Sequence, residues 1–304
     1  MINEDLGKRW NDCRDGQILV DASHPLKLLL GLSADGNKQL LVPVQEYVST
    51  LKSSASIKVT NGVAGEQKYI IIELINSSLT NEFIYLCIDL IEKSRFQSTP
   101  YKSVKALLDS FCKWQQLFDV AKKDLLSGYE IKGLIGEILF INQKIKSGVN
   151  ANSVIDAWQT HKDAARDFIF DDIWYEIKAV ASTSDHVTIS SIEQLDHESM
   201  GKLAIYFLDK KNNGDDLINL PMIIKQTKEL INDSSVVAQF TRKLLSKGYT
   251  YHQEYENEYF DFIKSNFYKV SDSFPVIRKE NIPEQILNAK YDISIKAIHS
   301  WLEV

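Results

Sequence analysis

Two carboxylates and one ammonium near the middle of the chain have residue types and a spacing that suit metal-assisted hydrolysis. The runs 166–170 and 173–180 are both rich in β-branched and aromatic residues, and only two aspartates separate them. Asp167 lies in the first run, and Glu176 and Lys178 lie in the second. A two-residue loop would pair the runs so that Asp167 faces Glu176, and the alternation of side chains along a strand puts Lys178 on the same face. We therefore predict a hairpin with two carboxylates whose Cβ atoms lie about 4.5–5.5 Å apart, beside an ammonium.

The repulsion between the two facing carboxylates points to a bound cation, which would offset it. Mg²⁺ commonly takes one or two protein carboxylates and completes its octahedron with water and phosphate oxygens, a role that Asp167 and Glu176 fit. Mg²⁺, or Mn²⁺ in its place, would polarise a phosphoryl oxygen and lower the pKa of a bound water, while Lys178 orients that water or stabilises developing negative charge. This is the chemistry of phosphodiester hydrolysis. The alternative interpretation is a solvated strand face with a weak ion pair.

A predicted helix upstream carries a third carboxylate. Residues 129–146 show an apolar stripe at helical spacing. The stripe consists of Ile131, Leu134, Ile135, Ile138, Ile141 and Ile145. Glu137 falls on the border of this stripe, where a carboxylate would be half-buried, although an ordinary boundary residue would occupy the same position. Gly133 and Gly136 lower helix propensity, and we expect them to let another backbone approach closely.

The order of these elements resembles the PD-(D/E)XK nuclease superfamily of restriction-endonuclease-like folds. A helix with Glu137, a strand with Asp167 and a strand with 176–178, followed by a further strand and helix, looks like the αβββαβ core of that superfamily. The chain is also similar to a bacterial branch of PD-(D/E)XK motif proteins. That similarity is carried by the segments 136–140, 167–168, 175–178, 189–195, 273–277 and 282–283. Arg166 replaces the proline of the superfamily motif, at the motif's most variable position.

The resemblance implies a role for each polar residue. Asp167 and Glu176 would bind the metal, and Glu137 would complete or polarise the metal site through a water. Lys178 would assist the attacking water. Gln194 would play an auxiliary role, or would instead belong to a capping box that opens the helix after the third strand.

The resemblance also implies what the chain acts on. The substrate would be DNA, the activity that of a Mg²⁺-dependent endonuclease, and the setting bacterial restriction or defence against phage. Partners would be a second copy of the chain or other proteins of the defence system. The alternative, from another class, is a DNA-binding or assembly subunit that keeps the fold and cuts nothing. Intact Asp167, Glu176 and Lys178 favour the enzyme, whereas the acidic net charge favours dependence on partners that deliver the DNA.

Charge is unevenly distributed along the chain, whose formal net charge is -6. Residues 147–216 carry 6 basic and 13 acidic groups, whereas residues 95–146 carry 9 basic and 5 acidic groups. An anionic substrate would be repelled from the acidic segment unless a metal neutralised it. We therefore expect phosphate contacts from the basic segment, with Lys105, Lys122 and Lys123 as candidates. A solvated helix face would explain these lysines equally well.

The composition is that of an ordinary globular protein. The 304 residues are 44% hydrophobic and 25% charged, and no apolar stretch approaches the length of about 18 residues that a membrane helix needs. The first residues are charged, so we predict neither a signal peptide nor a membrane span. Cys13, Cys87 and Cys112 have no metal-like spacing and leave one thiol unpaired in any disulfide scheme, which favours a reducing cytoplasm.

We expect an α+β protein in three parts. Residues 1–98 contain short β-rich runs separated by turn signals, which predicts an antiparallel β-rich domain. These runs are 18–20, 27–32, 40–44, 57–60, 69–75 and 83–90. Residues 99–216 would form the restriction-endonuclease-like core with its leading helices, and 203–208 would be the last strand of the core sheet. Residues 217–304 would form a mainly helical segment.

Overall fold

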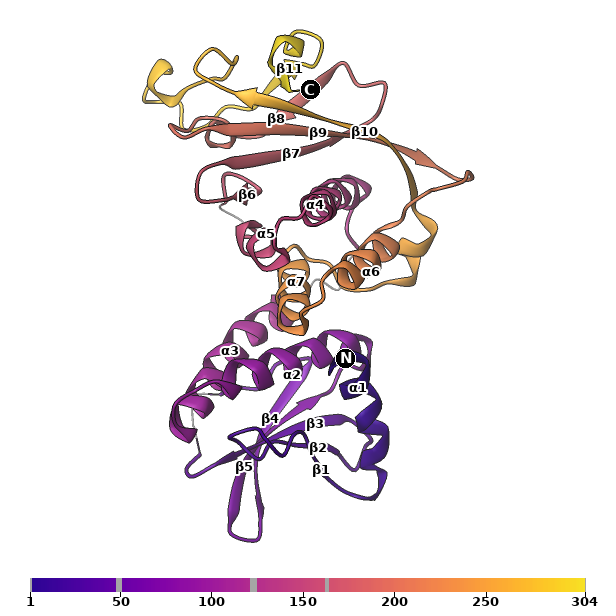
Figure 1. Ribbon diagram of the computed structural model, residues 1–304, viewed down its shortest axis with the longest axis vertical. Coiled ribbons are helices and arrows are strands. Elements are labelled where there is room, and N and C mark those ends of the chain that lie inside the picture. The colour runs from indigo at the N-terminus through magenta and orange to yellow at the C-terminus, as the bar shows by residue number, and fades with distance from the viewer. Residues whose placement is uncertain (1, 48–50, 121–124, 162–163, 304) are drawn as a thin grey trace. The chain divides into compact units, whose positions relative to one another are not determined.

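A computed structural model describes residues 2–47, 51–120, 125–161 and 164–303 (Figure 1). Its contacts divide the chain into two compact units. Unit 1 comprises Met1–Lys123 and Asn232–Tyr251, and unit 2 comprises Asp124–Ile231 and His252–Val304. This division differs from the three consecutive ranges that the sequence suggested, because a segment from the last range returns to the N-terminal unit.

Unit 1 is built on an antiparallel five-stranded sheet, as the sequence predicted. The strand order is β1-β2-β3-β5-β4, and every neighbouring pair is antiparallel. The strands are β1 (Ile18–Leu19), β2 (Leu29–Leu32), β3 (Lys38–Val44), β4 (Ile57–Ala64) and β5 (Gln67–Leu74). Alternate residues of β3, Leu40, Val42 and Val44, belong to the main core cluster of unit 1, as the alternation of side chains along a strand requires, and Leu41 between them is buried outside that cluster.

Helices lie over one face of this sheet, and α7, from much later in the chain, packs on α2 and α3 (Figure 1). They are α1 (Ile2–Arg9), α2 (Thr80–Arg95), α3 (Pro100–Val120) and α7 (Ser234–Ser246), with the 3₁₀ turns Trp10–Asp15 and Ser77–Leu79. The prediction of a strand over 83–90 is wrong, because this run lies inside α2. Its buried residues Phe83, Leu86, Cys87 and Leu90 recur at helical spacing. The boundary expected after residue 98 is likewise only the turn between α2 and α3, and both helices belong to unit 1.

A buried carboxylate joins three helices of unit 1. Asp89 of α2 is 2% exposed, and its Oδ2 accepts hydrogen bonds from Ser110 Oγ (2.5 Å) and Trp114 Nε1 (2.9 Å) of α3. Arg242 of α7 places NH1 3.9 Å from the same oxygen. Burying a charge is costly unless it is paired and hydrogen-bonded, so this arrangement satisfies Asp89 only when all three helices are assembled.

We expect Asp89→Ala to lower the free energy of unfolding by about 1–3 kcal/mol, because the substitution leaves the buried donors of Ser110 and Trp114 without their acceptor. Urea denaturation followed by tryptophan fluorescence measures this change. Asp109→Ala, at an exposed position of α3, is the matched control. An unfolding midpoint of Asp89→Ala equal to that of the control would show that Asp89 does not hold the three helices together.

Unit 2 contains a mixed five-stranded sheet with the order β12-β10-β9-β7-β6. Strands β7 and β9 are parallel, and the other neighbours are antiparallel. The strands are β6 (Phe168–Ile169), β7 (Trp174–Val180), β9 (Gly201–Lys211), β10 (Tyr259–Val270) and β12 (Leu302–Glu303). A separate two-stranded sheet pairs β8 (His186–Ile189) with β11 (Tyr291–Ser294). The helices are α4 (Gly128–Lys146), α5 (Ala151–Ala157) and α6 (Leu220–Leu230), with 3₁₀ turns at Ile192–Gln194, Gln253–Asn257, Lys279–Asn281 and His299–Trp301.

Three expectations for this region need correction, although the α+β class holds. The strand predicted over 203–208 lies within β9, but β9 is central and not last, because β10 pairs along its whole length. The final part of the chain is only partly helical, since β10, β11 and β12 follow α6 and α7. The helix expected after the third strand is a single 3₁₀ turn, and β8 pairs with β11 outside the main sheet. The full αβββαβ order is therefore not reproduced.

The described helices include none that is both long enough and apolar enough to cross a membrane. The three cysteines are free thiols, of which Cys13 and Cys87 are buried and Cys112 is exposed.

Candidate active site

The hairpin of β6 and β7 has the predicted register. Phe168 pairs with Tyr175, and the backbone N–H of Phe170 donates to the carbonyl oxygen of Ile173 at 2.9 Å. The loop between them is therefore the two aspartates alone. Asp167 immediately precedes β6, and its Oδ2 accepts a hydrogen bond from the backbone N–H of Ile177 at 2.8 Å. The Asp167 carboxylate is thus held beside the strand that carries the other two polar residues.

Glu176 is the most unusual group of the hairpin. Its side chain is 2% exposed, and its Oε1 lies 2.8 Å from the Lys178 ammonium. Its Oε2 is buried, and no donor among the described residues reaches it. Burial and the neighbouring charge of Asp167 raise the pKa of Glu176 to about 8, although Lys178 opposes the shift. The chain alone therefore supplies too little positive charge to hold both carboxylates ionised.

Lys178 is fixed between a carboxylate and an amide. Its Nζ donates to Glu176 Oε1 and, at 3.1 Å, to Gln194 Oε1. Burial lowers the pKa of Lys178, but the charges of Glu176 and Asp167 raise it by more, so the net shift is upward and the side chain is an ammonium. These two contacts hold the ammonium beside Glu176.

Gln194 contacts Lys178 and also bonds to the backbone. Its Oε1 accepts from the backbone N–H of Ser190 at 2.7 Å as well as from Lys178. The side chain of Ser191, the residue before the 3₁₀ turn, forms no capping hydrogen bond. The capping box that would pair Gln194 with Ser191 is therefore absent, and Gln194 accepts hydrogen bonds from both the turn backbone and the ammonium.

Glu137 lies on α4 and is half-buried, as predicted. Its Oε2 accepts a hydrogen bond from Trp158 Nε1 at 2.5 Å, and its charge makes a small contribution to the raised pKa of Glu176. Within the described chain, no three His, Cys, Asp or Glu side chains form a group that could hold a metal ion by themselves. The structure thus does not gather Glu137 with Asp167 and Glu176 into a three-carboxylate centre, and its action through a water stays a prediction.

The close approach of α4 to β7 depends on one of the two glycines. A Cβ at Gly136 would lie 3.2 Å from Ala179 Cβ and 3.6 Å from Ile177 Cγ2, so any larger residue there would require α4 or β7 to shift by a few tenths of an ångström. This confirms the expectation for Gly136. Gly133 has no heavy atom within 4 Å of such a Cβ, so close packing does not explain it.

The sequence assigned no role to two residues near the site. Trp158, which follows α5, donates to Glu137 and stacks on Phe168, and no local pattern predicts this non-local contact. Arg166 donates from NH2 to the carbonyl oxygen of Asp196 at 2.7 Å and lies 5.0 Å from the centroid of the Trp174 ring. The sequence signal that could have indicated a role for Arg166 is its charge at the position where the motif has a proline.

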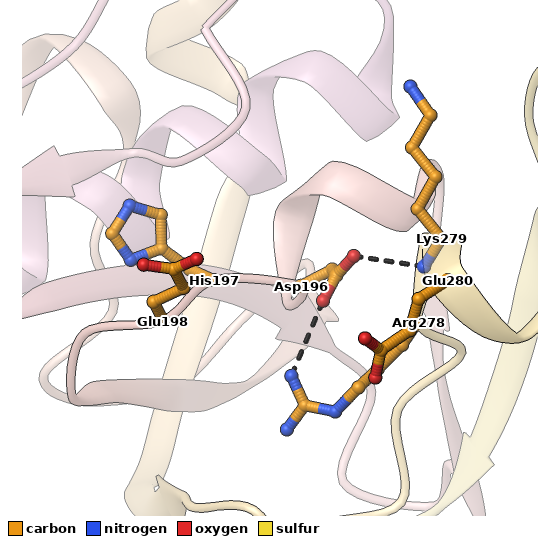
Figure 2. A pocket seen from close by; sticks show the side chains of 6 residues that line it. All are labelled: Asp196, His197, Glu198, Arg278, Lys279 and Glu280. Carbon is orange, nitrogen blue, oxygen red and sulfur yellow. Dashed lines mark hydrogen bonds and ion pairs between the residues drawn. The ribbon is translucent and has the colours of Figure 1, made fainter.

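A pocket of about 530 Å³ lies where the Asp196 turn meets the C-terminal segment (Figure 2). It is lined by Asp196, His197, Glu198, Arg278, Lys279 and Glu280. The Asp196 carboxylate accepts from the backbone N–H of Lys279 at 2.9 Å and pairs with Arg278 NH1 at 3.3 Å (Figure 2). The cationic groups of this pocket are thus partly neutralised, and none of the proposed metal ligands lines it.

The proposed phosphate-binding lysines are only partly described. Lys105 is exposed on α3 of unit 1, whereas Lys122 and Lys123 lie outside the described residues. Their DNA contacts stay a prediction.

The hairpin of β6 and β7 thus carries Glu176 and Lys178, follows Asp167 directly and packs against α4, which carries Glu137. A family model described as "Putative PD-(D/E)XK family member, (DUF4420)" matches residues 6–296, and the chain belongs to this family. The match confirms the superfamily that the motifs indicated. No curated protein and no solved structure matches the chain.

Proposed function

We propose that this chain is a metal-dependent deoxyribonuclease that hydrolyses phosphodiester bonds of DNA. The single observation that carries the proposal is the buried Oε2 of Glu176, which has no donor among the described residues and lies beside Asp167. An unpaired buried carboxylate oxygen is costly, and a hard divalent cation with oxygen ligands would satisfy it. Mg²⁺ fits, with Asp167 and Glu176 as ligands, and Mn²⁺ should substitute.

The residues of the hairpin have distinct jobs in this proposal. Bound Mg²⁺ would supply the polarisation of a phosphoryl oxygen and an acidified water. Lys178 holds its ammonium beside the ligands, where it can orient the attacking water and stabilise negative charge that develops on the phosphate. Gln194 keeps Nζ in place from the other side. Glu137, half-buried on α4, would act through a water.

The family supports a nuclease-like activity, and restriction or defence against phage in bacteria is the setting that we propose for it. The alternative is a DNA-binding or assembly subunit that does not cut. The adjacency of Glu176 and Lys178 favours the enzyme, because a purely structural hairpin would have no need of an unpaired buried carboxylate oxygen.

Incubation of the pure protein with supercoiled, linear and single-stranded DNA tests the proposal. We expect cleavage with Mg²⁺ or Mn²⁺, none with EDTA, and none from Asp167→Asn, which removes the charge while keeping the shape. The assay is repeated with the products of neighbouring genes. DNA binding without cleavage under all of these conditions would contradict the proposal and support the non-cutting subunit.

Replacing Lys105, Lys122 and Lys123 with alanine should weaken binding of duplex DNA and flatten its salt dependence. Each lost phosphate contact reduces the slope of log K against log salt by about 0.9. Fluorescence anisotropy at several salt concentrations measures both quantities. The same replacement at Lys225 and Lys228 of α6 in unit 2 is the control. Unchanged affinity and slope would assign the three lysines to a solvated surface.

A further inference from the structure

Two of the most exposed aromatic side chains lie at one end of the α2–α3 helix pair. Phe96 is 83% exposed in the turn between the helices, and Tyr101 is 78% exposed in the first turn of α3. Asp89 on α2 bonds to Ser110 and Trp114 on α3, so the two helices are antiparallel and their ends meet at this turn. Neither ring contributes to the core of unit 1.

The same end of the helix pair is rich in cations. Residues 93–108 include no Asp or Glu, although the full chain has a formal net charge of -6. Lys93, Lys102 and Lys105 are exposed and form no ion pair with a described residue. The fourth cation, Arg95, is different, because it pairs with Asp21 at 2.6 Å and with Glu92 at 3.5 Å. Three lysines therefore remain to attract an external anion.

Two of the lysines, Lys102 and Lys105, share a face of α3 with one of the rings, whereas Lys93 lies in the last turn of α2. Tyr101 and Lys105 are four residues apart, and Lys102 and Lys105 are three apart, so they are neighbours on the helix surface. Cations in the first turn of a helix oppose its dipole, and α3 has no acidic residue there to compensate. The cost of this placement would be offset by a bound phosphate, which the helix dipole and the lysines both attract.

We propose that Lys93, Phe96, Tyr101, Lys102 and Lys105, here called the aromatic tip, bind single-stranded DNA. Phe96 and Tyr101 stack on unpaired bases, and the three lysines contact the phosphates. The inference rests on the proposed function in that it takes DNA as the substrate. Duplex DNA hides its base faces, so the rings select unpaired strands whereas the lysines alone would not.

Fluorescence anisotropy with a labelled oligothymidine and with a blunt duplex of equal length tests the aromatic tip. In EDTA, we expect the double variant Phe96→Ala, Tyr101→Ala to lose at least about tenfold in affinity for the single strand and less than about twofold for the duplex. Tyr47→Ala is the matched control, because Tyr47 is an exposed ring of the same unit with Lys68 Nζ 5.6 Å from its centroid. The control should bind as the wild type does, and urea denaturation should give all three proteins the same unfolding midpoint.

Equal losses for single strand and duplex, or no loss for either, would overturn the inference. Loss of self-association without loss of DNA affinity would also overturn it and would make the tip a protein contact. Failure of the proposed nuclease function can be distinguished from failure of this inference, because the aromatic tip lies in unit 1 and the hairpin of β6 and β7 lies in unit 2. A wild type that cuts nothing but binds the single strand through Phe96 and Tyr101 would retain the tip and reject the nuclease. Intact DNA cleavage by the double variant, with unchanged affinity for the single strand, would retain the nuclease and reject the tip.

Discussion

Asp167→Ala is expected to abolish metal-supported DNA cleavage and to weaken the binding of divalent metal. The substitution removes an anionic ligand, and the remaining carboxylate of Glu176 is already paired with Lys178. Lys178→Ala is expected to behave differently. An ammonium is not a metal ligand, so its loss should spare or strengthen metal binding while turnover falls by about 10²–10³-fold, as for other electrostatic stabilisers of developing charge.

Calorimetric Mn²⁺ titration beside a plasmid-cleavage assay separates the two variants. Lys178→Met, which keeps most of the apolar stem, serves as a second variant in case Lys178→Ala folds poorly around Glu176. Asp172→Ala, in the exposed loop of the same hairpin, is the control and should match the wild type. Equal metal binding and equal activity in wild type, Asp167→Ala and Lys178→Ala would contradict the assignment of this hairpin as the active site.

The second large effect concerns pH. The pKa of Glu176 in the folded, metal-free protein is about 8, above the ordinary value of 4.5. Between these values the folded state holds a proton that the unfolded state has lost, so stability falls as pH rises from about 4.5 to about 8. Each unit of pKa shift corresponds to about 1.4 kcal/mol. The metal-free wild type should therefore lose a few kcal/mol of stability across this range.

Glu176→Gln should remove this loss, because the amide keeps the shape and does not titrate. Urea denaturation of both proteins in EDTA from pH 5 to pH 9 gives the difference in unfolding free energy. The unfolding free energy of the variant should increase relative to that of the wild type as pH rises, and this difference should level off above about pH 8. If the difference in unfolding free energy did not change with pH, the pKa of Glu176 would not be raised in the folded protein.

Metal binding should be coupled to the loss of the same proton from Glu176. Calorimetry in buffers of different ionisation enthalpy should show about one proton released per Mn²⁺ at pH 7 and none at pH 9, because a ligating carboxylate must first be deprotonated. Metal affinity should accordingly rise up to about pH 8. Proton release by Glu176→Gln equal to that of the wild type would contradict this linkage.

The hairpin was predictable because its information is local. A loop of two residues leaves one register for the strands around it, and the observed pairing of Phe168 with Tyr175 is the one that this register requires. The half-burial of Glu137 was predictable for a similar reason, since it follows from the period of a single helix.

The remaining features depend on contacts between distant parts of the chain. The run 83–90 has the β-branched and aromatic residues of a strand, yet it packs as a helix because its apolar positions fit the core at helical spacing. Strand β10 pairs with β9 although α6 and α7 separate the two strands in the sequence, and α7 belongs to unit 1, where Arg242 meets Asp89. The partner of Glu137, Trp158, is likewise set by tertiary packing.

Anomalous scattering from a crystal of the protein soaked in Mn²⁺ at pH 8 would locate a bound metal directly. We expect a peak at ligand distance from carboxylate oxygens of both Asp167 and Glu176, and no such peak in Asp167→Ala. A wild-type crystal in which Glu176 keeps its contact with Lys178 and no peak lies beside either carboxylate would contradict a metal-dependent nuclease at this site.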